Sequence, residues 1–190
     1  MIKAVYSDKA AVVQILTESF KENKSVNYII PQDGDRTTRI RSLMEYSFDL
    51  CFHFGKVLLS QDRKCCALLL HPDKKKSNLK TTLLDLKLIT KGIGLGNVRK
   101  TLSREAFIKQ FHPKAPFAYL WFIGTDPAHQ GKGIGSELLQ QIIEASRQDQ
   151  RPVYLETSTQ RNIKFYKDAG FSVYNESMRF GYPLYFLSNN

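Results

Sequence analysis

The chain has 190 residues, of which 42% are hydrophobic and 24% charged, a composition that suits one soluble globular domain spanning residues 1–190. No apolar stretch is long enough to cross a bilayer, and residues 1–9 lack the regions of a secretory signal, so we expect cytoplasmic residence without a membrane partner. The three cysteines, Cys51, Cys65 and Cys66, are odd in number and two are adjacent, so we expect buried thiols. With His71 they lack zinc-ligand spacing, and we predict no metal.

A net charge of +10 raises the possibility of nucleic-acid binding. The excess concentrates between Asp73 and Lys100, where eight basic residues and two acidic ones, Asp73 and Asp85, give a local charge of +6. No recognition helix, zinc finger or aromatic platform accompanies this stretch, so we favour a solvated helix face over nucleic-acid binding. Its field could also draw in a polyanionic ligand.

The first half of the chain predicts alternating strands and helices. Ile2–Tyr6 is a short apolar strand, and Ser7 can cap a following helix with apolar residues at helical spacing. Asn23–Asp35 is loop-like. A second helix is predicted from the apolar repeat that starts at Ile40, and it should end before Phe54.

The middle of the chain predicts a hairpin and then two helices. Lys56–Ser60 and Cys65–Leu70 flank a four-residue loop, as expected of two antiparallel strands. Asn78–Thr90 and Val98–Phe111 have helical patterns, and glycines at positions 92, 94 and 96 separate them.

The last third predicts a buried strand and a helix, followed by further strands. Phe117–Ile123 is apolar throughout, which predicts a central strand covered on both faces. A helix whose core stripe includes Leu138 and Ile142 follows. The remaining elements are expected at Val153–Glu156 (strand), Asn162–Ala169 (helix), Phe171–Tyr174 (strand) and Tyr182–Leu187 (strand). This order predicts an α/β fold.

The turn at residues 125–136 joins the central strand to its helix and carries Gly131, Gly133 and Gly135. A helix N-terminus has N–H groups without intrahelical partners and a partial positive charge, so it favours an anion. Glycines let a bulky phosphate approach, and Lys132 adds positive charge. The alternative is a glycine-rich connection without a ligand, although each glycine in a first helical turn costs about 1 kcal/mol relative to alanine.

Two familiar phosphate-binding loops fit this turn less well. No alignment supplies the Lys-Ser or Lys-Thr of a P-loop. A dinucleotide fingerprint could use Gly131 and Gly133, with Glu156 as the ribose-binding acid, but Ser136 stands at its third glycine position. Few residues follow Glu156 to build the further strand–helix units of such a domain, so this interpretation is the weaker one.

A third pattern combines the turn with a second block. The spacing Gln130-x-x-Gly133-x-Gly135, followed by a run from Asn162 to Tyr166 that ends in Gly170-Phe171, resembles the GNAT superfamily of acyl-CoA-dependent N-acyltransferases. The resemblance covers about a third of the chain. It implies one mixed, mostly antiparallel sheet of six or seven strands, flanked by helices, with the fourth and fifth strands splayed apart. Against that pattern, the helices at about 78–111 are an insertion whose role, scaffold or acceptor-site wall, stays open.

The resemblance also implies a ligand and its contacts. Pantetheine would lie along the fourth strand through backbone groups, and the pyrophosphate of acetyl-CoA would meet the N–H groups of the glycine turn. The implied binding residues are Ile123, Thr125, Gln130, Gly131, Lys132, Gly133, Ile134, Gly135, Ser136 and Asn162. Ile123 is equally compatible with an ordinary core position, Gln130 with shaping the turn, and Asn162 with capping a helix.

Tyr166 and Glu156 are the candidate catalytic residues. A phenol near the thioester sulfur can protonate the departing thiolate, which favours Tyr166 as general acid over a core partner of Phe165. A carboxylate can collect the proton of the attacking amine, and Glu156 is the available candidate, although a structural role is equally compatible. Cys65 and Cys66 have no evident histidine base and are not expected to act as nucleophiles.

The sequence therefore predicts an N-acetyltransferase that moves the acetyl group from acetyl-CoA directly to a primary amine. The acceptor and the oligomeric state are not specified by any motif. The alternative is a catalytically silent module that binds acyl-CoA or a dinucleotide.

Overall fold

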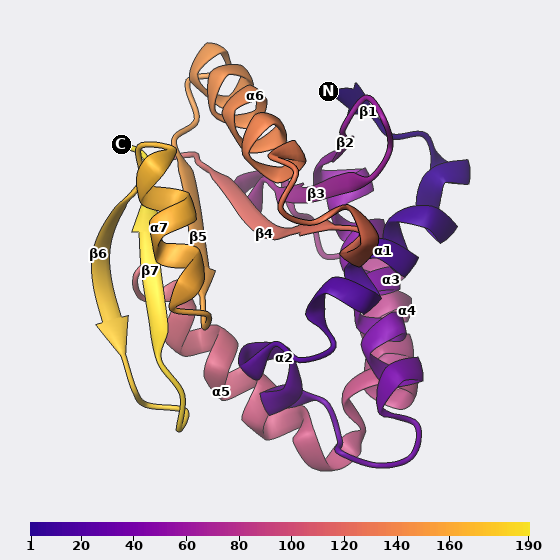
Figure 1. The fold of residues 1–190 in the computed structure, drawn as a ribbon. Coiled ribbons are helices and arrows are strands. Elements are labelled where there is room, and N and C mark those ends of the chain that lie inside the picture. Colours follow the sequence, from indigo (N-terminus) through magenta and orange to yellow (C-terminus); the bar gives the residue numbers. More distant parts are fainter.

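A computed structural model describes all residues 1–190 and shows a seven-stranded sheet with helices on both faces (Figure 1). The strand order is β1-β2-β3-β4-β5-β7-β6, and every neighbouring pair is antiparallel except β4 and β5. The strands are β1 (Ile2–Lys3), β2 (Gly55–Leu59), β3 (Cys65–Leu70), β4 (Ala118–Thr125), β5 (Val153–Thr157), β6 (Ser172–Ser177) and β7 (Leu184–Ser188). The predicted α/β fold with a mixed, mostly antiparallel sheet is confirmed.

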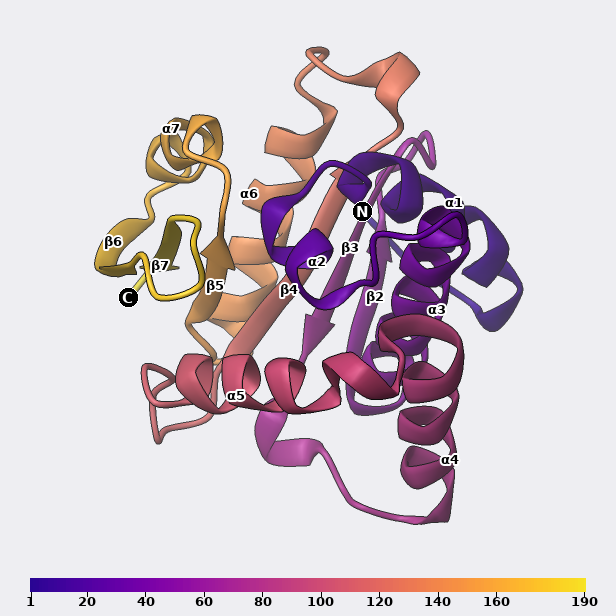
Figure 2. The same cartoon turned by 90° about the horizontal axis from the view of Figure 1, so that it is seen from below.

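Two layers of helices enclose the sheet, each with its own apolar core. The helices are α1 (Lys9–Phe20), α2 (Lys24–Ile29), α3 (Arg36–Phe54), α4 (Leu79–Leu88), α5 (Val98–Lys109), α6 (Ile134–Gln148) and α7 (Arg161–Asp168). Helices α1 and α3 pack on one side of β3 and β4, while α6 packs on the other (Figure 2). None of the helices combines the length and apolarity that a bilayer crossing requires.

Three local predictions near the N-terminus and in the last helix need correction. The predicted loop at residues 23–35 contains α2, because the Asn23 side chain caps this helix by accepting the Val26 N–H at 3.1 Å. The first strand ends at Lys3, and a 3-10 turn at residues 6–8 precedes α1 in place of a Ser7 cap. Asn162 is the second residue of α7 and does not cap it.

Strand β4 occupies the centre of the sheet, as predicted, but its two faces are not equally covered. Buried residues alternate with half-buried ones along the strand, and Trp121 forms a bulge, since Leu68 pairs with Phe122 while Leu69 pairs with Leu120. Strand β4 pairs with β5 only at residues 118–119 and 153–154, after which the two strands diverge. The gap is open at the end of β4 that leads into the glycine turn.

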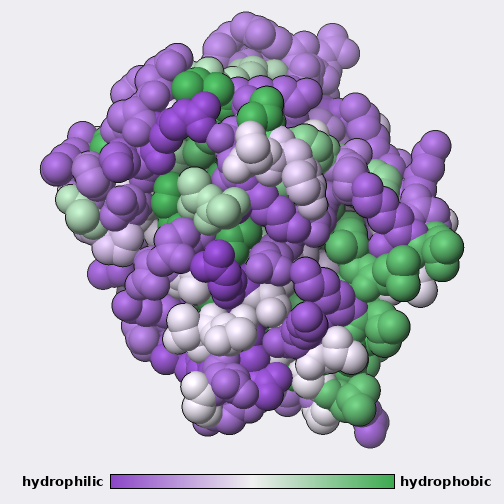
Figure 3. All heavy atoms as spheres, turned by 90° about the vertical axis from the view of Figure 1, so that its right-hand side faces the viewer, coloured by the Kyte–Doolittle hydropathy of each residue, from purple (hydrophilic) through white to green (hydrophobic).

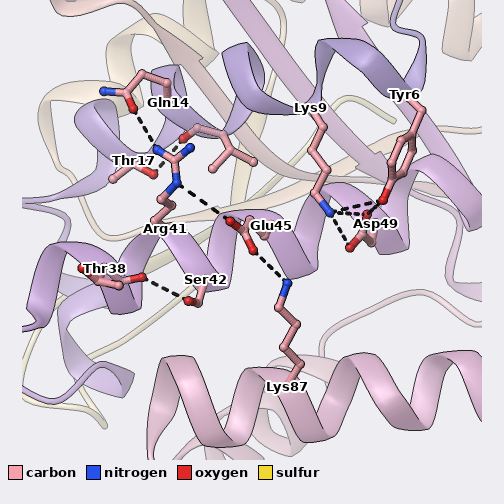
Figure 4. Close-up of polar contacts among 11 residues, drawn as sticks. Tyr6, Lys9, Gln14, Thr17, Thr38, Arg41, Ser42, Glu45, Asp49 and Lys87 are labelled. Atoms are coloured by element: carbon pink, nitrogen blue, oxygen red, sulfur yellow. Dashed lines mark hydrogen bonds and ion pairs between the residues drawn. The ribbon is translucent and has the colours of Figure 1, made fainter.

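The α4–α5 segment, residues 79–109, packs on α3 and then crosses near one end of the sheet (Figure 2). Tyr46 of α3 donates a hydrogen bond of 2.6 Å to Asp85. Figure 4 shows a second contact between α4 and α3, in which Lys87 pairs with Glu45 at 3.0 Å. At the other end of the segment, Ile108 lies in an apolar cluster with residues of β7 and of the β6–β7 loop. The segment is thereby attached to both halves of the molecule.

Candidate active site

A cavity of about 890 Å³ opens where β4 and β5 separate, and its volume is typical of ligand pockets, which measure about 300–1,000 Å³. Four parts of the chain line it: residues 19–24 at the end of α1, residues 123–136 from β4 into α6, residues 158–166 from β5 into α7, and Pro183. Most of the lining residues are polar or glycine. The lining therefore suits a polar ligand that extends from the glycine turn to α7.

The glycine turn leaves open space in front of a helix N-terminus. Gly131 and Gly133 have φ values of 77° and 79°, the left-handed region that side chains disfavour, and Gly133 is the N-cap of α6. No heavy atom lies within 4 Å of the position that a Cβ would take at either glycine. An anion can therefore approach the unpartnered N–H groups of the first turn of α6 without meeting a side chain.

The end of β4 is held against α1 and the turn by its carbonyl group. The carbonyl of Thr125 accepts the Ser19 hydroxyl at 2.9 Å and the Gln130 amide at 3.2 Å. At Gly124, a Cβ would lie 3.0 Å from Leu16 and from the Ser19 hydroxyl, so a larger residue would push these side chains of α1 away by a few tenths of an ångström. Gln130 both shapes the turn and lines the cavity, and the Thr125 carbonyl is already doubly hydrogen-bonded.

Tyr166 packs in the core while its side chain also lines the cavity. Its ring contacts Phe165 and Phe171 edge-on, with centroid distances of 5.0 Å and 5.7 Å. Its hydroxyl makes no hydrogen bond to another protein group, and the residue as a whole is 6% exposed. Burial raises the pKa of Tyr166 above its usual value, so the phenol is protonated at neutral pH and can act as a proton donor.

Glu156 lies at the splay of the strands but is held by two other side chains and does not line the cavity. Its carboxylate accepts a 2.6 Å hydrogen bond from the Tyr119 hydroxyl, and its other oxygen lies 2.9 Å from Nε2 of His112. The Glu156 side chain is only 4% exposed. Burial, followed by the neighbouring charge of Glu156, raises the pKa of Tyr119, which keeps that phenol a hydrogen-bond donor.

Two further residues were not predicted from the sequence: Arg104, which lies in α5, and His112, which lies in the loop after it. Arg104 is 11% exposed and donates to the Tyr182 hydroxyl at 3.1 Å, to Glu105 at 2.8 Å and to the Ser25 hydroxyl. These contacts connect α5 to α2 and to the β6–β7 loop. No local pattern in the sequence indicates that either residue reaches across to these partners.

The fold brings together most of the residues expected to bind the carrier. The cavity lining includes Ile123, Thr125, Gln130, Gly131, Gly133, Ile134, Gly135, Ser136, Asn162 and Tyr166. Lys132 is exposed outside the lining, and Glu156 lies behind it. All three thiols are buried, and burial is the largest cause that raises the pKa of Cys65 and Cys66, which disfavours a nucleophilic thiolate.

Comparison with known proteins places these features in a family. The profile of the Acetyltransferase (GNAT) family matches residues 93–171, which include both the glycine turn and the Asn162–Tyr166 helix. An N-alpha-acetyltransferase RimI of Mycobacterium tuberculosis is 38% identical over 74 residues, which cover 37% of this chain and 46% of that protein. The match thus spans less than half the length of this relative.

Solved structures share the fold over nearly the whole chain. A structure from Corynebacterium glutamicum described as histone acetyltransferase HPA2 and related acetyltransferase has a TM-score of 0.74 at 23% identity, covering 99% of this chain and 93% of that one. Arylalkylamine N-acetyltransferase 2 of Aedes aegypti has a TM-score of 0.63 at 15% identity, covering 100% and 98%. The fold is therefore that of the acetyltransferases. Both sequence motifs lie inside the region that matches the GNAT acetyltransferase family.

Proposed function

We propose that this protein is an acetyl-CoA-dependent N-acetyltransferase that transfers the acetyl group directly to a primary amine. The observation that carries the proposal is the single cavity that holds both the open N-terminus of α6 and the unpartnered Tyr166 hydroxyl. The diphosphate of coenzyme A would occupy the space in front of Gly131 and Gly133. Its pantetheine arm would then extend along the splayed edge of β4 past Ile123 and Asn162 toward Tyr166.

In the proposed reaction, the neutral amine attacks the thioester carbonyl carbon, and the resulting tetrahedral intermediate expels the thiolate of coenzyme A. Tyr166 donates its proton to the departing sulfur. The nitrogen loses a proton as the amide forms, and Glu156 is the proposed acceptor of that proton. Since Glu156 lies behind the cavity lining, this transfer needs an intervening water molecule or the Tyr119 hydroxyl as a relay.

The contacts made by α5 and the loop after it favour a role for the α4–α5 segment as a wall of the acceptor site. His112 and Arg104 fix Glu156, Tyr182 and Ser25 beside the gap between β4 and β5. Two of the relatives named above are named for chemically different amines, an α-amine and arylalkylamines. An acceptor screen should therefore begin with peptide α-amines and arylalkylamines, and then extend to lysine side chains and polyamines.

Calorimetry and a thiol-release assay together test the proposal. We expect coenzyme A to bind competitively with acetyl-CoA, and thiol release to become amine-dependent with at least one acceptor class. Binding of coenzyme A without thiol release across the whole panel would favour a catalytically silent acyl-CoA module. Binding of NAD in preference to coenzyme A would instead favour the dinucleotide interpretation.

A further inference from the structure

The exposed leucines of this protein are confined to the α4–α5 segment. Every leucine outside residues 79–109 is buried. Within the segment, Leu79, Leu83 and Leu86 of α4 are 78%, 57% and 56% exposed, and Leu95 and Leu102 are exposed as well. Since exposed leucine is otherwise absent from the molecule, its concentration in one segment is typical of an interaction surface.

Helix α4 has a fixed inner face and a free outer face. Leu84 and Leu88 pack against the core beneath the helix, and the Tyr46–Asp85 hydrogen bond helps to hold it on α3. The Lys87–Glu45 ion pair, drawn in Figure 4, makes a second link to α3. Leu79, Leu83 and Leu86 recur at i, i+4 and i+7, so they share the opposite face. Figure 3 shows hydrophobic side chains gathered along one edge of this side of the molecule, where α4 lies. We refer to Leu79, Leu83 and Leu86 as the leucine face.

Unpaired lysines surround the leucine face. Lys74, Lys75, Lys76, Lys80 and Lys91 are exposed and form no ion pair. The two acidic residues of the stretch are engaged elsewhere, because Asp73 pairs with Arg151 at 2.7 Å and Asp85 accepts the Tyr46 hydroxyl. Lysine number alone favours a solvated face, but a basic helix that also carries exposed leucines is typical of a helix that lies on a membrane surface.

We infer that the leucine face and its lysines form a docking surface for an anionic phospholipid bilayer. The leucines would enter the region between headgroups and acyl chains, and the lysines would lie among the phosphates. A second copy of the chain is disfavoured because its own lysines would meet these at close range. A specific protein partner would need about 1,200–2,000 Å² of total buried surface, more than three leucine side chains on one helix provide.

Vesicle co-sedimentation with the full-length protein tests the inference. We expect binding to vesicles that contain phosphatidylglycerol, weakening as salt is raised, and no binding to vesicles of phosphatidylcholine alone. Replacing both Leu83 and Leu86 by serine should weaken binding to the anionic vesicles by about tenfold or more. Replacing both Lys76 and Lys80 by glutamine should weaken it to a similar degree, since each lysine near an anionic surface contributes about fivefold.

Matched control variants test whether vesicle binding depends on this particular surface or only on the protein's total exposed apolar area and net charge. Met178→Ser removes another exposed apolar side chain, and the pair Lys3→Gln and Lys167→Gln removes the same net charge elsewhere. Both controls should bind vesicles like the wild type, and coenzyme A binding should be the same in all variants. Because the changed side chains are solvent-exposed, loss of folding does not confound the comparison.

Three outcomes would overturn the inference. One is wild-type binding that does not depend on lipid charge. Another is equal vesicle binding by the leucine variant and the wild type. The third is a concentration-dependent dimer in sedimentation velocity that Leu83→Ser and Leu86→Ser abolish, which would assign the leucine face to a second copy of the chain.

Discussion

The hydroxyl of Tyr119 on β4 donates a 2.6 Å hydrogen bond to Glu156 on β5, which lies two residues past Tyr154, the last β5 residue that pairs with β4. The bond spans the start of the gap into which the proposed pantetheine arm would enter. Together with His112, it leaves Glu156 in one defined position. A carboxylate fixed in this way is oriented before a substrate arrives, which is the arrangement that a general base needs.

If Glu156 collects the proton of the acceptor amine, Glu156→Gln should lower kcat by about 100-fold and leave coenzyme A affinity unchanged, since Glu156 does not line the cavity. His112→Gln should lower kcat less, because it disturbs the position of the carboxylate without removing it. Stopped-flow thiol release and calorimetry would measure the two quantities. Full turnover by the Glu156→Gln variant would assign the residue a structural role.

Tyr166→Phe tests the proposed general acid. Loss of the hydroxyl should lower kcat by about 100-fold, while the affinity for acetyl-CoA and the thermal stability should stay close to those of the wild type, because the hydroxyl has no protein partner to lose. Phe165→Leu serves as a control that alters the aromatic packing and leaves the phenol in place. Unchanged single-turnover acetyl transfer in Tyr166→Phe would remove Tyr166 from the mechanism.

Alanine substitutions at two glycines with similar positive φ values distinguish an effect on folding from an effect on ligand binding. Gly133 and Gly170 both have positive φ and open space at the Cβ position, so alanine at either should destabilise the fold by about 1 kcal/mol. Only Gly133→Ala places a methyl group before α6, and we expect it to weaken coenzyme A binding at least tenfold, as measured by calorimetry. Equal affinities in the two variants would place the diphosphate elsewhere.

His71 should make the protein sensitive to mild acid. Burial, with the nearby charges of Arg151 and Lys74, lowers the pKa of His71 from 6.5 to about 4. Between these values the unfolded chain binds a proton that the folded chain does not, so the free energy of unfolding decreases as the pH falls. The decrease attributable to this residue is about 3 kcal/mol at most. In urea titrations over this pH range, His71→Gln should flatten the dependence, and an unaltered slope would contradict the assignment.

Much of the site was predictable because its signals are local. Glycines at 131 and 133 indicate a turn with positive φ values, which neighbouring residues alone can predict. The spacing from Asn162 to Tyr166 likewise places two side chains on one helix. His112 was not predictable. Its partner Glu156 lies 44 residues further along the chain, and no periodicity links them.

Other errors come from short elements whose stability depends on tertiary contacts. Helix α2 has six residues, too few to form alone, and only the Asn23 cap indicates it. Strand β4 was expected to be covered on both faces, but alternate residues along it are half-buried, and Trp121 adds a bulge opposite β3. Composition cannot reveal a bulge, since the extra residue is defined only relative to the partner strand.

The cavity wall joins Ser19 to Pro183, positions separated by most of the chain. A ribosome-bound polypeptide consequently has no complete pocket until the segment that reaches Pro183 has emerged. We therefore expect a ligand that stabilises the protein through the complete pocket to protect the full-length chain from proteolysis more than a growing one.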